Sequence, residues 1–228
     1  TELRRLNTAQ VLSALRRDGP ATRTALAERT GLAKATVGSI VAVLEEHGAV
    51  TEHGPVAAGR GRPGRPVALT GRPGAGIGLE VNVDYLAAVA VDISGSTVSS
   101  EVVAADPDAP LDGLAPLVER TRRALADAGL TALGTVCAVP GTGLGGTPNL
   151  PSGAAGVAAR LAEIVPDGSG ALENDANCAA LAEVMGGALV GVPDALYLTG
   201  TVGIGAGVVV GGRLHTGERG LVGEVGHM

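Results

Sequence analysis

The first fifty residues show apolar positions at helical spacing, interrupted by short polar breaks. The pattern predicts one helix over residues 6–15, a second over 23–29 and a third over 33–47. Thr22 can cap the second helix, and Thr30-Gly31-Leu32 supplies a tight turn before the third. Two short helices joined by a glycine-containing turn predict a helix-turn-helix, with an ordinary three-helix bundle as the alternative. The third helix is expected to bury Val37, Ile40, Val41 and Leu44.

The stretch that follows predicts the wing of a winged helix. Residues 49–53 and 67–70 favour two strands around the loop 59–66, which combines Arg, Gly and Pro without any acidic residue. Such a narrow basic segment suits the minor groove and resembles an AT-hook, with a solvated linker as the alternative. The second helix of a helix-turn-helix enters the major groove. The candidate DNA contacts are therefore Arg23, Lys34, Ala35, Thr36, Ser39, Arg60, Arg62 and Arg65.

The residues beyond Arg72-Pro73-Gly74 predict a second, α/β domain. Alternating apolar positions favour a strand hairpin over 77–83 and 86–93 that turns near Asp84-Tyr85. We therefore expect domains at residues 1–72 and 76–228. The other expected elements are strands at 97–104, 133–139, 195–199 and 207–210, helices at 111–128 and 157–164, a helix from Asp175 to about Leu189, and a short segment at 224–228.

The charge distribution separates the two expected domains. The formal net charge is −6, but residues 1–73 hold 11 Lys and Arg against 6 Asp and Glu, which gives +5. Residues 74–228 hold 6 against 17, which gives −11. A basic head on an acidic body predicts that the head binds a polyanion and the body does not.

Composition excludes several classes of protein. No apolar run approaches the roughly 20 residues that a membrane span needs. Residues 3–17 are rich in Arg, unlike a signal peptide, so we expect a cytoplasmic protein with no membrane partner. Cys137 and Cys178 are too few for a disulfide framework and lack metal-type spacing, so we expect buried small residues.

The sequence Glu173-Asn174-Asp175-Ala176-Asn177 is the most informative of the body. It places a carboxylate between amides, after an expected strand end and at an expected helix start, where α/β sheets hold their ligand-binding residues. The alternative is that Asn174 or Asp175 only caps the helix. Pro148-Asn149-Leu150-Pro151 precedes it, and the glycine-rich run 203–214 and Gly223-Glu224-Val225-Gly226-His227-Met228 follow. In this order, the motifs resemble the ROK family (repressors, open reading frames, kinases) from about Gly78 onward.

The resemblance implies an actin-like, sugar-kinase-type fold and a set of sugar-contacting positions. Asp175 would be the position of the base in the kinases of the family, where it accepts the proton of the attacking hydroxyl. The kinases also carry a glycine-containing phosphate loop, and the corresponding place here reads Glu80-Val81-Asn82-Val83-Asp84-Tyr85, with side chains where bare backbone is needed. The ligand-binding positions that the resemblance implies are Asn149, Asn174, Asp175, Glu224 and His227.

The resemblance also gives His227 a possible role as a zinc ligand. Its partners would be cysteines in a motif beyond Met228, so we expect no cofactor in this chain and a structural zinc only in a full-length version. The second lobe of the fold would be incomplete, so we expect the sequence to be a fragment or a truncated gene product.

These features together predict a sequence-specific DNA-binding transcriptional regulator, a repressor, rather than an enzyme. Its expected partners are double-stranded DNA, a sugar or sugar phosphate effector, and a second copy in a homodimer or higher homo-oligomer, because such heads read paired half-sites. The first alternative is a sugar kinase with an added DNA-binding head. The second is a DNA-binding dimer that responds to no ligand.

Overall fold

The computed structural model describes residues 2–54, 64–141, 150, 152–166, 168–200, 203–218 and 220–227. The chain forms two compact units. The first comprises residues 1–75 together with Asp92–Ser96, and the second comprises Gly76–Val91 and residues 97–228. None of the described helices combines the length and apolar character required to span a bilayer.

The first unit begins with three helices, α1 (Glu2–Asp18), α2 (Arg23–Thr30) and α3 (Lys34–Glu46). The Thr22 hydroxyl accepts a hydrogen bond from the Ala25 backbone N–H at 3.2 Å, which confirms the expected cap of α2. Gly31 ends α2 with φ of 71°, a left-handed conformation that glycine adopts without strain. The predicted helix-turn-helix is therefore confirmed.

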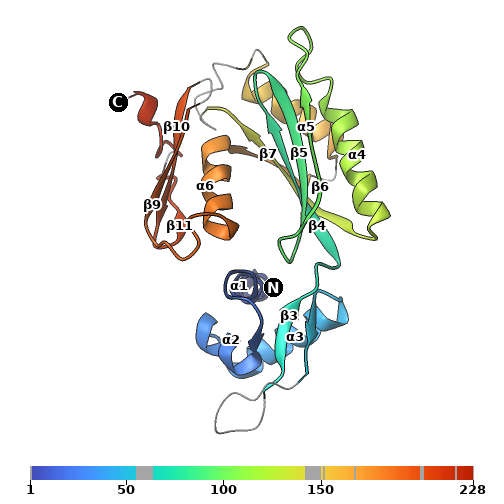
Figure 1. The fold of residues 1–228 in the computed structure, drawn as a ribbon, viewed down its shortest axis with the longest axis vertical. Coiled ribbons are helices and arrows are strands. Elements are labelled where there is room, and N and C mark those ends of the chain that lie inside the picture. Colours follow the sequence, from blue (N-terminus) through green and yellow to red (C-terminus); the bar gives the residue numbers. More distant parts are fainter. Residues whose placement is uncertain are drawn as a thin grey trace. The chain divides into compact units, whose positions relative to one another are not determined.

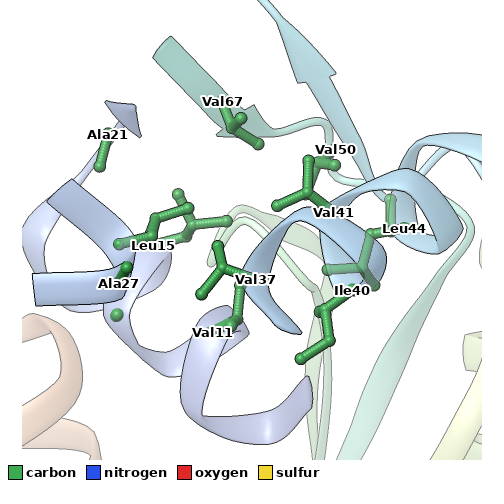
Figure 2. Close-up of a cluster of buried hydrophobic side chains, with 13 residues drawn as sticks. Val11, Leu15, Ala21, Ala27, Val37, Ile40, Val41, Leu44, Val50 and Val67 are labelled. Atoms are coloured by element: carbon green, nitrogen blue, oxygen red, sulfur yellow. The ribbon is translucent and has the colours of Figure 1, made fainter. Parts of the chain in front are cut away.

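The core of this unit is aliphatic (Figure 2). Val37, Ile40, Val41 and Leu44 of α3 are all buried, as their spacing predicts, and pack with Val11 and Leu15 of α1. Burial in α1 is confined to Val11, Ala14 and Leu15, and Leu6, near the start of the helix, is 58% exposed. Ile93, from the Asp92–Ser96 turn, packs against this core.

A small antiparallel sheet completes the first unit. Its strands are β1 (Ala21–Thr22), β2 (Val50–Glu52) and β3 (Pro66–Leu69), in the order β1-β3-β2. The pairing of β2 with β3 confirms the two strands of the predicted wing, whereas β1 is too short to leave a periodic signal. Residues 55–63 of the loop between them, including Arg60 and Arg62, lie outside the described residues.

The second unit is built on a five-stranded sheet with the order β6-β5-β4-β7-β8. The outer pair β5 and β6 is antiparallel, and β7 and β8 are parallel. The first hairpin turns at Asn82–Asp84, and Tyr85 already belongs to the second strand, one residue earlier than expected. The strands are β4 (Gly74–Val81), β5 (Tyr85–Asp92), β6 (Thr97–Ala104), β7 (Thr131–Val139) and β8 (Gly170–Asn174).

Helices α4 (Leu114–Asp127) and α5 (Gly153–Ile164) cover one face of this sheet (Figure 1). Helix α4 packs on β6 and β7, and α5 packs on β8. The buried side chains of α4 are those that its helical spacing predicts: Leu114, Leu117, Val118, Thr121 and Leu125.

Helix α6 (Asp175–Gly186) contacts β7 and β8 and also a second sheet of three strands (Figure 1). That sheet has the order β11-β10-β9, formed by β9 (Ala195–Gly200), β10 (Ile204–Val210) and β11 (Arg213–Leu214), and a short 3-10 turn follows at Val225–His227. Helix α6 ends three residues before the expected Leu189, at a pair of glycines. A Cβ on Gly207 would lie 2.6 Å from the Ala176 carbonyl oxygen, so this glycine lets β10 approach α6.

The approach of the returning wing strand to the cap of α2 generates a stability prediction. A Cβ on Gly64 would lie 2.6 Å from Thr22 Cγ2, and Thr22 is held by its capping bond. We expect Gly64→Ala to lower the free energy of unfolding by about 1–3 kcal/mol, because overpacking displaces the cap. Gly54→Ala is the matched control, since nothing lies within 4 Å of its Cβ position. Equal stability of the two variants in urea denaturation would contradict this packing.

Candidate functional site

The exposed N-terminal part of α3 is the candidate DNA-reading surface. Lys34, Ala35 and Ser39 are exposed and Thr36 is half-buried, while Val37 on the same helix is fully buried. The N-cap residue Ala33 makes no side-chain capping hydrogen bond, and the first turn holds no acidic residue. The backbone N–H groups of that turn therefore present the positive end of the helix dipole beside a Lys ammonium, an arrangement that attracts phosphate.

The expected DNA contacts Arg23 and Arg65 are engaged in ion pairs inside the first unit. Arg23 Nη2 lies 3.1 Å from Glu45 Oε2 and 3.0 Å from Glu52 Oε1. Arg65 Nη1 lies 3.7 Å from Glu52 Oε2. Both arginine side chains keep a large exposed fraction, 44% and 62%, so these pairs hold the guanidinium groups without covering them.

In the second unit, the carboxyl ends of β7 and β8 and the start of α6 converge on the side chain of Asn174. Its Oδ1 accepts from the Asn177 backbone N–H at 3.0 Å and thereby caps α6, while its Nδ2 donates to the Gly141 carbonyl at 2.7 Å. Both ends of the amide are used internally, so Asn174 fixes the geometry of the turn. Whether it also contacts a sugar stays a prediction.

Glu173 and Asn177 reinforce the same turn from within. Glu173 Oε1 accepts from the Asn174 backbone N–H at 2.9 Å and from Asn177 Nδ2 at 3.0 Å. Asn177 is 6% exposed, and its Oδ1 has no hydrogen-bond partner in the described structure. Of the two amides that flank Asp175 in the sequence, Asn174 bonds to the backbone and Asn177 bonds to the Glu173 carboxylate.

Asp175, the first residue of α6, lines a cavity. Its Oδ1 accepts a hydrogen bond from the Ala176 backbone N–H at 2.8 Å. Burial raises the pKa of this carboxyl, and the nearby Glu80 and Glu224 raise it further, while the backbone hydrogen bond acts in the opposite direction. The carboxylate is thus held in a place where its own charge is disfavoured, which is common at functional sites.

The turn between β4 and β5 brings a second polar cluster to this cavity. The Tyr85 hydroxyl donates to Glu80 Oε1 at 2.5 Å, and Asn82 Nδ2 lies 3.3 Å from both Glu80 Oε1 and the Tyr85 oxygen. Burial and the Glu80 carboxylate raise the pKa of Tyr85 to about 12. Asn82 is only 3% exposed, so this cluster forms a closed polar group at the end of β4.

The cavity has a volume of about 570 Å³ and lies between the five-stranded sheet and α6 with β9. Glu80, Tyr85 and Asp175 give it a polar end, and Tyr197 and Thr199 of β9 contribute further polar groups. Small apolar side chains form the rest of its wall, among them Ala87, Val89, Val136, Ala138, Ala179 and Ala182. The described lining residues include no Lys or Arg.

The two cysteines lie beside this site. Cys137 is fully buried on β7, as expected, whereas Cys178 on α6 is only half-buried and lines the cavity. Burial raises the pKa of Cys137 to about 12 and that of Cys178 to about 11. Both thiols therefore stay protonated near neutral pH and are poor nucleophiles.

The structure describes only some of the other expected ligand positions. Glu224 lies near enough to Asp175 to raise its pKa. Asn149 and the His227 side chain lie outside the described residues. The described His, Cys, Asp and Glu side chains form no group of three or more that could hold a metal ion, so zinc binding by a longer version of the chain stays a prediction.

Glu80 and Tyr85 are pocket residues and Glu52 is an ion-pair partner that the sequence does not reveal. The residue pattern of 80–85 predicts only a phosphate loop that has lost its glycines. The alternation of β4 did carry a signal, since Glu80 is a charged side chain within an otherwise apolar strand. Nothing local marks Glu52, because its partners Arg23 and Arg65 lie far from it in sequence.

Comparison with known proteins finds a matching family model for each of the two units. The ROK family model matches residues 76–228, and the model of the IclR helix-turn-helix domain matches residues 6–54. The chain is 31% identical to a xylose repressor of Bacillus spizizenii, over all of this chain and 61% of the repressor.

Two solved structures share the architecture. The ROK family transcriptional regulator described as a homologue of the E. coli MLC protein matches with a TM-score of 0.74 and 21% identity, over 98% of this chain and 59% of the regulator. The ROK hexokinase from Thermus thermophilus matches with a TM-score of 0.56 and 36% identity, over 68% of this chain and 53% of the hexokinase. The chain thus spans less than two thirds of the length of each of these relatives. Because the ROK family model covers more than half of the chain, including the Asp175 turn and its pocket, the chain belongs to the ROK family and carries a helix-turn-helix domain before its ROK domain.

Proposed function

We propose that the chain is the DNA-binding and effector-sensing part of a sugar-responsive transcriptional repressor. The observation that carries this proposal is the pairing, in one chain, of a helix-turn-helix whose α3 exposes Lys34, Ala35 and Ser39 with a ROK unit that holds Asp175 in a cavity. The relative from Bacillus spizizenii is named a xylose repressor, which supports the same function.

The DNA-binding step follows from α3. Small exposed side chains at Ala35 and Ser39 permit close approach to base edges, and Lys34 with the open helix N-terminus favours phosphate. We further propose a homodimer in the cytoplasm, because helix-turn-helix proteins read two half-sites about one helical turn apart and each chain supplies one reader.

The effector that the pocket favours is a neutral sugar rather than a sugar phosphate. Hydroxyl groups can donate to the carboxylates of Asp175 and Glu80, whereas a phosphate would meet two carboxylates and no cation among the described lining residues. Four arginines of the second unit, which lie on its helices, are instead engaged with other partners. Arg120 pairs with Glu101, Arg123 with Glu119 and Arg160 with Glu163, and Arg122 donates a hydrogen bond to the Ile164 carbonyl.

The likeness to a ROK hexokinase favours sugar phosphorylation as the second candidate function. The β4–β5 turn argues against it. The Asn82 backbone N–H donates to the Tyr85 carbonyl at 2.9 Å, and the Val83 N–H donates to Asn82 Oδ1 at 2.7 Å. These two donors close the turn on itself, where a kinase needs backbone N–H groups directed at phosphate oxygens. We therefore propose a regulator without kinase activity.

We expect Thr36 and Ser39 to set sequence choice. Thr36→Ala and Ser39→Ala should change the ranking of operator variants, because a base-edge contact contributes about 1–3 kcal/mol of discrimination. Binding would be measured on duplexes selected by the wild-type chain from a random library. Thr24→Ala on α2, another exposed hydroxyl, is the matched control. An unchanged ranking in both α3 variants would show that α3 is not the reader.

We expect Asp175→Asn to weaken binding of neutral pentoses or hexoses by the equivalent of about 1–3 kcal/mol in calorimetry, because a buried hydrogen-bond partner is lost. The same substitution should raise the melting temperature. The raised pKa means that the folded state holds the Asp175 proton more tightly than the unfolded state does. Stability is therefore fully present below the ordinary aspartate pKa and is lost as pH rises through the folded-state value.

The stabilising effect of Asp175→Asn should accordingly be largest near neutral pH and vanish below about pH 4, near the ordinary pKa of an aspartate. Asp108→Asn, at an exposed loop position, is the control for the change in net charge. Sugar binding that survives Asp175→Asn would place the effector elsewhere. Absence of any sugar binding by the wild-type chain would favour the ligand-independent DNA-binding dimer.

We expect no sugar-dependent release of ADP when the chain is incubated with ATP, magnesium and a panel of hexoses. A positioned base contributes only about 10²–10⁴-fold to a reaction rate, and phosphoryl transfer depends chiefly on holding the phosphate. The ROK hexokinase from Thermus thermophilus serves as the positive control. Turnover that disappears in Asp175→Asn would overturn this expectation and restore the kinase.

A further inference from the structure

One carboxylate at the root of the wing joins four elements of the first unit. Glu52, the last residue of β2, is within 3.0 Å of Arg23 Nη2, at the first residue of α2. Its other oxygen lies 3.7 Å from Arg65 Nη1, just before β3. The same Arg23 nitrogen donates to Glu45 Oε2 at 3.1 Å, near the end of α3.

The backbone around this group is also tied. The His53 N–H donates to the Pro66 carbonyl at 2.8 Å, and Thr22 pairs with Pro66 across β1 and β3. Gly64 passes so close to Thr22 that a side chain there would collide with it. The ion pairs therefore lie at a junction where backbone contacts already bring together the root of the wing, the N-terminus of α2 and the C-terminal end of α3.

The Glu52 side chain is only 19% exposed, whereas Arg23 and Arg65 are 44% and 62% exposed. An isolated surface ion pair contributes little, but a network whose central carboxylate is largely covered restricts its members more strongly. A guanidinium has five N–H donors in a rigid fork, so each arginine can keep its Glu52 contact and still donate outward to a phosphate.

A carboxylate on a DNA-binding head weakens attraction to every duplex alike, because phosphate binding follows net charge. The presence of the Glu52 carboxylate at the wing root therefore needs a role that compensates for the weaker attraction to DNA. We propose that Glu52 is a positioning residue for DNA recognition. It sets the directions of Arg23 and Arg65 relative to α3, so that both arginines reach the DNA phosphates only when α3 is in register with the bases that it reads. This inference rests on the proposed DNA-binding function.

Two substitutions separate charge from position. Glu52→Gln removes the charge and the ion pairs, and Glu52→Asp keeps the charge but shortens the side chain by one methylene. Glu46→Gln is the matched control, because Glu46 is an exposed acidic residue of α3 for which no ion pair is found among the described residues. Each full-length variant would be titrated against the duplex selected by the wild-type chain and against a scrambled duplex of the same composition, at several salt concentrations.

We expect Glu46→Gln to tighten binding to both duplexes equally. Glu52→Gln should tighten binding to the scrambled duplex while the ratio of selected to scrambled affinity falls roughly 10-fold, the effect of about one misplaced base contact. Glu52→Asp should leave the scrambled affinity and the salt slope near the wild-type values and still lower the ratio. A purely structural role would lower the melting temperature without changing the ratio.

The proposal is overturned if Glu52→Gln behaves like Glu46→Gln and Glu52→Asp behaves like the wild type. Melting curves recorded for each variant ensure that the titrations are made well below unfolding, and a ratio that falls only as the melting temperature is approached also overturns it. A wild-type chain that enriches no duplex from the library contradicts the proposed function itself, a result distinct from an unchanged ratio.

Discussion

The two-ended hydrogen bonding of Asn174 is the constraint on which the second unit depends. One end of its amide caps α6, and the other end holds the chain after β7 at Gly141. Because β7 and β8 are parallel, with Val139 opposite Asn174, their carboxyl ends meet at one edge of the sheet. Asp175 follows the cap directly and so has a fixed position at the cavity, which no flexible loop would give it.

This arrangement holds the Asp175 carboxyl group in a buried place where its charged form is disfavoured. Burial and the nearby Glu80 and Glu224 all disfavour the Asp175 carboxylate, and hydrogen bonds from the backbone at Ala176 and Asp175 act in the opposite direction. The Tyr85 hydroxyl satisfies Glu80 and leaves Asp175 facing the cavity. Sites of this kind lower the stability of the empty protein, and a ligand that donates hydrogen bonds to the carboxylates returns part of that free energy on binding.

Local signals allowed much of the fold to be predicted. The buried face of α4 and that of α3 follow from helical spacing, and the Thr22 cap follows from residue type alone. The juxtaposition of Glu80 with Asp175 could not be predicted, because it depends on β4 and β8 both lying next to β7 in the sheet. The extent of burial along α1 could not be predicted either, because periodicity indicates which face of a helix is apolar but not how far its packing partners extend along it, and Leu6 is exposed.

The two units use helix starts in the same physical way. Thr22 caps α2 and fixes Arg23, the next residue, and Asn174 caps α6 and fixes Asp175, the next residue. In each case an internal hydrogen bond satisfies the helix terminus and the neighbouring charged side chain gains a defined direction. Helix α3 differs, because Ala33 offers no capping side chain. Its first-turn N–H groups are not capped by a side chain, and under the proposed function the phosphate backbone of DNA would supply the acceptors for them.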